Sequence, residues 1–124
     1  MAGRILYLDD EQPLVFLMTR MLTHLGHKVS GFTSGKEAVE AFRASPGEFD
    51  LILTDMSMPH MSGLEFAQEI LKIAPQARVV IATGCIDPNW AEHARASGVR
   101  EVIEKPNSVG DMSQVVTRLL AAGT

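Results

Sequence analysis

Short apolar segments alternate with longer segments of helical period along this chain of 124 residues. Most of the short segments contain consecutive Val, Ile or Leu residues, which is typical of strands buried on both faces of a sheet. The longer segments carry apolar residues every three or four positions, the spacing of a helix with one buried face. The predicted strands are residues 4–8, 28–32, 49–54, 78–82 and 100–104.

Helix start signals precede the longer segments. Ser34 and Ser62 are each followed three positions later by a glutamate, Glu37 and Glu65, which is the pattern of a capping box. The other helices are predicted to begin near Pro13, at Asp87 followed by Pro88, and at Ser108 or Asp111.

A strand followed by a helix, repeated five times, predicts a parallel sheet covered by helices on both faces. The connections between parallel strands are expected to be right-handed. We therefore predict an α/β, flavodoxin-like (βα)5 doubly wound sheet with strand order 2-1-3-4-5. No linker, low-complexity tract or internal repeat divides the chain, so residues 1–124 are expected to form a single domain.

Polar residues follow four of the five predicted strands. Asp9 and Asp10 follow the first strand, Asp55 the third, Thr83 the fourth and Lys105 the fifth. In an open parallel sheet the carboxyl ends of the strands meet at one edge, where ligands bind. Three carboxylates in one place repel each other, and Mg²⁺, which prefers oxygen ligands, relieves that repulsion.

The same residues suit a phosphoryl group. A carboxylate can accept a phosphoryl group covalently as an acyl phosphate, which indicates a role for Asp55. Lys105 would neutralise one phosphoryl oxygen, and the hydroxyl of Thr83 would donate to another.

Each residue also has a plainer explanation. Asp9 and Asp10 could cap the first helix, where acidic side chains suit the helix dipole. Asp55 could belong to an Asx turn, and Lys105 could be a surface lysine. The joint pattern favours the site, because a chance match of all four strand ends in this order is improbable.

Composition excludes several classes of function. The net charge of −4 and the absence of a Lys/Arg cluster argue against direct binding to nucleic acid. The single cysteine, Cys85, excludes an internal disulfide. No apolar run approaches the ~20 residues of a membrane span, and the amino-terminal residues lack a signal-peptide core. We therefore expect a cytoplasmic protein without a membrane partner.

Four motifs together resemble the receiver domain of response regulators in two-component signalling, and the resemblance covers essentially the whole chain. The motifs are Leu-Asp-Asp-Glu at 8–11, Thr-Asp-Met-Ser-Met-Pro-His-Met-Ser-Gly at 54–63, Ala-Thr-Gly at 82–84 and Glu-Lys-Pro at 104–106.

The resemblance implies a role for each site residue. Asp55 would be the phosphoacceptor, with Lys105 as the phosphate-binding cation and Thr83 as the switch hydroxyl. Asp10 would bind Mg²⁺ directly and Asp9 through water. Asp55 itself and the backbone carbonyl of Ser57 would complete the protein ligands. The family also implies a cis peptide bond between Lys105 and Pro106.

One position departs from the family pattern. The family often has Tyr or Phe three residues before the lysine, and here the residue is Val102. The resemblance therefore does not imply the usual coupling between the threonine and an aromatic ring. Residues 100–106 are similar to receivers appended to hybrid histidine kinases, so the chain is expected to be either a stand-alone receiver or a piece of such a kinase.

The predicted function is a signalling switch that accepts a phosphoryl group on Asp55 from a histidine kinase or phosphotransfer protein. It would catalyse only its own phosphorylation and dephosphorylation. By resemblance, the first helix would dock the donor, and the fourth helix, fifth strand and fifth helix would contact a downstream partner or appended domain. The resemblance also allows a homodimer.

Two alternatives stay open. The first is an interaction scaffold that works without phosphorylation. The second is a Mg²⁺-dependent aspartyl phosphatase, although such enzymes place a second aspartate where this chain has Ser57. A nucleotide-binding loop is not supported, because neither GxxxxGK[ST] nor GxGxxG follows the first strand.

Overall fold

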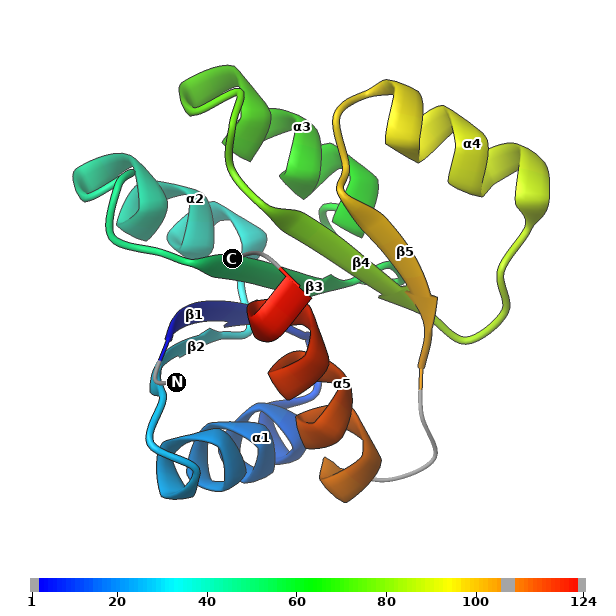
Figure 1. Cartoon of the computed structure of the whole chain (residues 1–124). Helices are drawn as coiled ribbons and strands as arrows, with labels where there is room; N and C mark the ends of the chain where they lie inside the picture. The colour runs from blue at the N-terminus through cyan, green and yellow to red at the C-terminus, as the bar shows by residue number, and fades with distance from the viewer. Residues whose placement is uncertain (1–2, 106–108, 123–124) are drawn as a thin grey trace.

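A computed structural model describes residues 3–105 and 109–122, and its centre is a sheet of five parallel strands. The strand order is β2-β1-β3-β4-β5, as predicted (Figure 1). β1 and β3 are therefore neighbours, although β2 lies between them in the sequence. The strands are β1 Arg4–Leu8, β2 Lys28–Phe32, β3 Leu51–Asp55, β4 Val79–Thr83 and β5 Glu101–Glu104.

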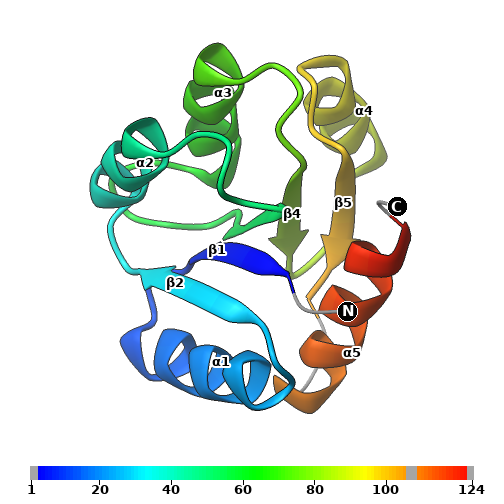
Figure 2. The ribbon, with the colours of Figure 1, turned by 60° about the vertical axis from the view of Figure 1, so that its left-hand side comes forward.

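A helix follows each strand, and the helices cover both faces of the sheet. α1 and α5 lie on one face, and α2, α3 and α4 lie on the other (Figures 1 and 2). None of the described helices is long and apolar enough to cross a membrane. The helices are α1 Gln12–His24, α2 Gly35–Ala44, α3 Gly63–Ile73, α4 Pro88–Ala96 and α5 Val109–Ala122.

Each central strand contributes side chains to two hydrophobic cores, one on each face of the sheet. In β1, Ile5 and Tyr7 belong to the core under α1 and α5, whereas Leu6 and Leu8 belong to the core under α2, α3 and α4. This alternation follows from the period of two in a strand. Asp9 continues the Ile5 and Tyr7 positions, so the strand period directs it toward the α1 and α5 side.

The helix starts largely follow the predicted signals. A complete capping box forms at Ser62 and Glu65, since the Ser62 hydroxyl accepts from the Glu65 N–H and the Glu65 carboxylate accepts from the Ser62 N–H. At Ser34 the structure shows the first of these two bonds, from the Glu37 N–H. Asp87 caps α4 as predicted, accepting from the backbone at the first turn.

Some details differ from the sequence predictions or lie outside the described residues. β4 and β5 each begin one residue later than predicted, at Val79 and Glu101. β3 begins at Leu51 rather than at residue 49. Leu25, expected on the buried face of the first helix, is exposed because α1 has ended before it. Ser108 and the Lys105–Pro106 peptide bond lie outside the described residues.

Candidate functional site

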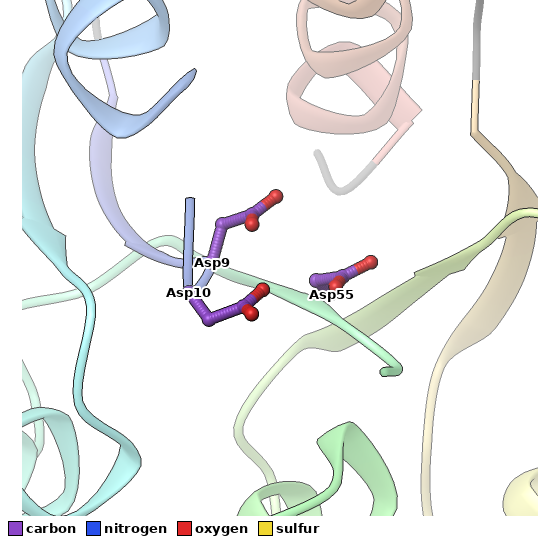
Figure 3. A group of neighbouring side chains, drawn as sticks. All are labelled: Asp9, Asp10 and Asp55. Atoms are coloured by element: carbon purple, nitrogen blue, oxygen red, sulfur yellow. The ribbon is translucent and has the colours of Figure 1, made fainter. Parts of the chain in front are cut away.

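Strand pairing brings the predicted site residues to one edge of the sheet. Asp9 and Asp10 follow β1, and Asp55 is the last residue of β3. One carboxylate oxygen from each of these three residues lies within 4.8 Å of the others (Figure 3). The predicted acidic cluster is therefore present in the fold.

Lys105 joins the cluster from the end of β5. Its Nζ lies 3.1 Å from Oδ2 of Asp9 and 3.1 Å from Oδ1 of Asp55. The Lys105 N–H also donates to the carbonyl of Thr83, which anchors the lysine backbone to the end of β4. One ammonium group therefore bridges two carboxylates that would otherwise repel each other.

Asp9 is fully buried and well supplied with hydrogen-bond donors. Its Oδ2 accepts from Lys105 Nζ at 3.1 Å and from the Tyr7 hydroxyl at 3.2 Å. Its Oδ1 accepts from the Glu11 N–H at 3.0 Å. A buried carboxylate is tolerated only when its oxygens are paired in this way.

The environment changes the proton affinity of three groups. Burial raises the pKa of Asp55, and the negative charges of Asp9 and Asp10 raise it further, against the opposing effect of Lys105. Burial alone would lower the pKa of Lys105, but its hydrogen bonds to Asp55 and Asp9 outweigh burial and raise that pKa. The pKa of Tyr7 is raised, mainly by burial and then by Asp9, so its phenol stays a donor.

The residues present fit a small divalent cation. Asp10 is exposed, so its carboxylate is open to a hydrated ion, whereas Asp55 is only 7% exposed and borders the same space. An all-oxygen donor set with solvent on one side suits Mg²⁺, which keeps several of its waters. Asp9 is committed to three donors, which agrees better with contact through a water than with direct binding.

The structure gives less direct support for the predicted roles of Thr83 and Ser57. The Thr83 hydroxyl donates to the carbonyl of Cys85, 3.2 Å away in its own loop, rather than to the acidic cluster. Ser57 is exposed in the loop between β3 and α3. The switch role of Thr83 and the ligand role of the Ser57 carbonyl therefore remain predictions.

Val102, the departure from the family pattern, is buried in the core under α2, α3 and α4. Trp90 of α4 packs against the same core while staying half-buried. The tryptophan therefore has a packing role, whether or not it also contacts a partner.

Tyr7 is a site residue that the sequence analysis missed. It is 2% exposed, and its hydroxyl reaches Asp9 from the core under α1 and α5. The signal was present in the sequence, because positions 5, 7 and 9 share one face of a strand. Its apolar neighbours made Tyr7 look like an ordinary core residue.

Comparison with known proteins agrees with this geometry. The family model described as the response regulator receiver domain matches residues 5–117. The chemotaxis protein CheY of Thermotoga maritima is 30% identical over 86% of this chain and 88% of its own length. A crystal structure of a response regulator receiver domain protein from Clostridium thermocellum superposes with a TM-score of 0.84, at 31% identity, over 97% of this chain and 95% of that one.

Longer proteins also contain a matching segment. The aerobic respiration control sensor protein ArcB of Escherichia coli is 31% identical over 94% of this chain, which corresponds to 15% of the ArcB sequence. The chain spans less than half of the length of several curated relatives that it matches, from 10% to 44%. The family model, the relatives and the fold agree, and the chain belongs to the response regulator receiver domains, the signalling modules of two-component systems.

Proposed function

We propose that this chain is a phosphorylation-dependent switch in which Asp55 accepts a phosphoryl group from a phosphohistidine of a histidine kinase or phosphotransfer protein. The observation that carries the proposal is the bridge of Lys105 between Asp9 and Asp55 at the carboxyl edge of the sheet. It brings a carboxylate nucleophile and the ammonium group of a lysine to the same point. We also propose that residues 1–124 form one such domain.

The chemistry requires the ionised form of Asp55. A carboxylate oxygen of Asp55 forms a bond to phosphorus while the bond from phosphorus to the donor nitrogen breaks. The electron pair of that bond stays with the donor imidazole, and the product is an acyl phosphate. Lys105 then pairs with one phosphoryl oxygen. The Thr83 hydroxyl leaves the Cys85 carbonyl and donates to a second phosphoryl oxygen.

A divalent cation belongs to this proposal. Asp10 and Asp55 would hold Mg²⁺ directly and Asp9 through water, with the Ser57 carbonyl as a further ligand. Bound Mg²⁺ would supply positive charge that offsets the repulsion between the carboxylates and an anionic phosphoryl donor.

The partner surfaces follow from the same proposal. α1 begins beside the site and exposes Phe16 and Leu17, with Arg20 stacked over the Phe16 ring at 5.6 Å. Exposed apolar side chains next to a polar site suit a docking surface for the phosphodonor. A downstream partner, an appended domain or a second copy would then contact the face formed by α4, β5 and α5.

Incubation with acetyl phosphate and Mg²⁺ tests the proposal, with intact mass and released phosphate followed over time. We expect a gain of one phosphoryl group in the wild type and in Glu92→Gln, an exposed charge-matched control on α4, and none in Asp55→Asn. Multiple turnover of the donor would instead support an aspartyl phosphatase. No adduct under any condition would contradict the switch and leave the scaffold.

A further inference from the structure

Oδ2 of Asp9 accepts two hydrogen bonds, one from Lys105 after β5 and one from Tyr7 in β1. Lys105 Nζ lies 3.1 Å away and the Tyr7 hydroxyl 3.2 Å away. The two donor side chains differ in how freely they can change conformation. Lys105 ends a long side chain that is 26% exposed, whereas Tyr7 is a rigid ring within the hydrophobic core.

Phosphorylation of Asp55 changes the partners of the Lys105 ammonium group. The lysine now shares its ammonium between Asp9 and Asp55. A phosphoryl group on Asp55 carries more charge than the carboxylate, so the ammonium is drawn toward it and away from Asp9. Asp9 has no exposed surface, and the Tyr7 hydroxyl is the donor already in place at Oδ2 when the lysine turns away. A buried carboxylate oxygen that loses its donor carries the full penalty of desolvation.

We propose that Tyr7 is a positioning residue for the phosphoryl-transfer site, whose hydroxyl keeps Oδ2 of Asp9 paired when Lys105 turns to the phosphoryl group. This inference rests on the proposed function. Tyr7 does not touch the reacting atoms and acts only through Asp9 and Lys105.

The core fixes the direction of the phenol. Tyr7 belongs to the same hydrophobic core as Val15 and Met18 of α1 and Met112 and Val116 of α5, all of them buried. A buried ring within a close-packed core has little rotamer freedom, so its hydroxyl is presented to Asp9 at small entropic cost. The same packing means that Tyr7→Phe preserves the shape of the core and removes only the hydroxyl.

The first test compares Tyr7→Phe with Ser113→Ala. Ser113 is a buried residue of α5 whose hydroxyl donates to the Gly110 carbonyl rather than to a residue of the acidic cluster. Both variants remove one buried hydroxyl. We expect phosphorylation by acetyl phosphate with Mg²⁺ to slow about tenfold in Tyr7→Phe, as expected when a hydrogen bond to a charged group is lost, and to stay unchanged in Ser113→Ala. Equal rates in Tyr7→Phe and wild type would overturn the proposal.

The second test needs neither phosphorylation nor a metal ion. Tyr7 is the only tyrosine in the chain, so labelling the tyrosine ring carbon Cζ with ¹³C gives a single NMR signal. In metal-free protein, Lys105→Met leaves the phenol as the remaining donor to Oδ2, and we expect the Cζ signal to shift as that bond strengthens. Ser113→Ala should leave the signal in place. A signal unaffected by Lys105→Met would contradict the shared acceptor, whereas failure of the wild type to be phosphorylated would contradict the proposed function alone.

Discussion

At the scale of single residues, two buried carboxylates at one site have unequal partners. Asp9 has three donors to its two oxygens, whereas Asp55 shares the ammonium of Lys105 with it. The repulsion within the cluster is therefore felt most at Asp55, whose pKa is raised by burial and by both neighbouring aspartates. Because the negative charge of Asp55 is only partly balanced, forming a covalent bond or binding a cation would relieve the repulsion.

Asp55→Asn is predicted to stabilise the protein in the absence of divalent cations. A carboxyl group whose pKa is raised on folding binds its proton more tightly in the folded chain than in the unfolded chain. The stability it contributes is thus fully present below its ordinary pKa of 3.8 and is lost as the pH rises through the raised value. At pH 7 we expect a gain on the order of 1 kcal/mol, or about 4 °C in Tm for a domain of this size.

Thermal unfolding of both proteins between pH 3 and pH 7 measures this effect. The advantage of Asp55→Asn should shrink as the solution is acidified toward pH 3. A variant less stable than wild type at pH 7 would mean that the ion pair with Lys105 outweighs the burial and repulsion.

At the scale of elements, the connection from β3 to α3 determines where Asp55 is presented. The Thr54 hydroxyl donates to the Asp55 carbonyl at 2.9 Å, and the Gly63 N–H donates to the Met56 carbonyl at 2.9 Å. The capping box of Ser62 and Glu65 determines where α3 begins. The loop that carries Ser57 is therefore held at both ends.

Gly63→Ala is predicted to disturb the site through the backbone. A Cβ at this position would lie 2.4 Å from the Asp55 carbonyl oxygen, closer than real contacts allow, so α3 must move away from the end of β3. We expect a loss of about 1–3 kcal/mol in the free energy of unfolding and slower phosphorylation of Asp55. Gly47→Ala is the matched control, because a Cβ there meets nothing within 4 Å. Wild-type stability and rate in Gly63→Ala would show that the loop tolerates the displacement.

At the scale of the whole molecule, the strand order brings distant segments together. β1 and β3 are neighbours, so Asp9 and Asp10 meet Asp55 across more than forty intervening residues. β5 brings Lys105 to the same edge. The acidic edge is thus a property of the folded sheet, and binding of a cation there is linked to folding.

Mg²⁺ is predicted to stabilise the folded protein by mass action. A ligand at a hundredfold excess over its Kd adds about 2.7 kcal/mol to the free energy of unfolding. We expect Mg²⁺ to raise the Tm of wild type and of Glu92→Gln, and to have little effect on Asp10→Asn. Both variants remove one negative charge, so an equal response in the two would indicate nonspecific screening rather than a site at Asp10.

Much of this organisation could be predicted from the sequence. The runs of Val, Ile and Leu marked the buried strands, and the acids and the lysine at their ends marked the shared edge. The side-chain contacts were harder to predict, because the pairing of Lys105 with Asp9 and the bond from Tyr7 depend on rotamers within the core. The exposure of Leu25 was missed because the helical pattern continued one residue past the end of α1.

The most direct test of the account is to locate the phosphoryl group. After reaction with acetyl phosphate and Mg²⁺, borohydride reduces an acyl phosphate to an alcohol, and peptide mass spectrometry identifies the altered residue. The account predicts reduction at Asp55 alone, dependent on Mg²⁺. Reduction at Asp10 or another carboxylate instead, or modification of Asp55 at the same rate without a divalent cation, would contradict it.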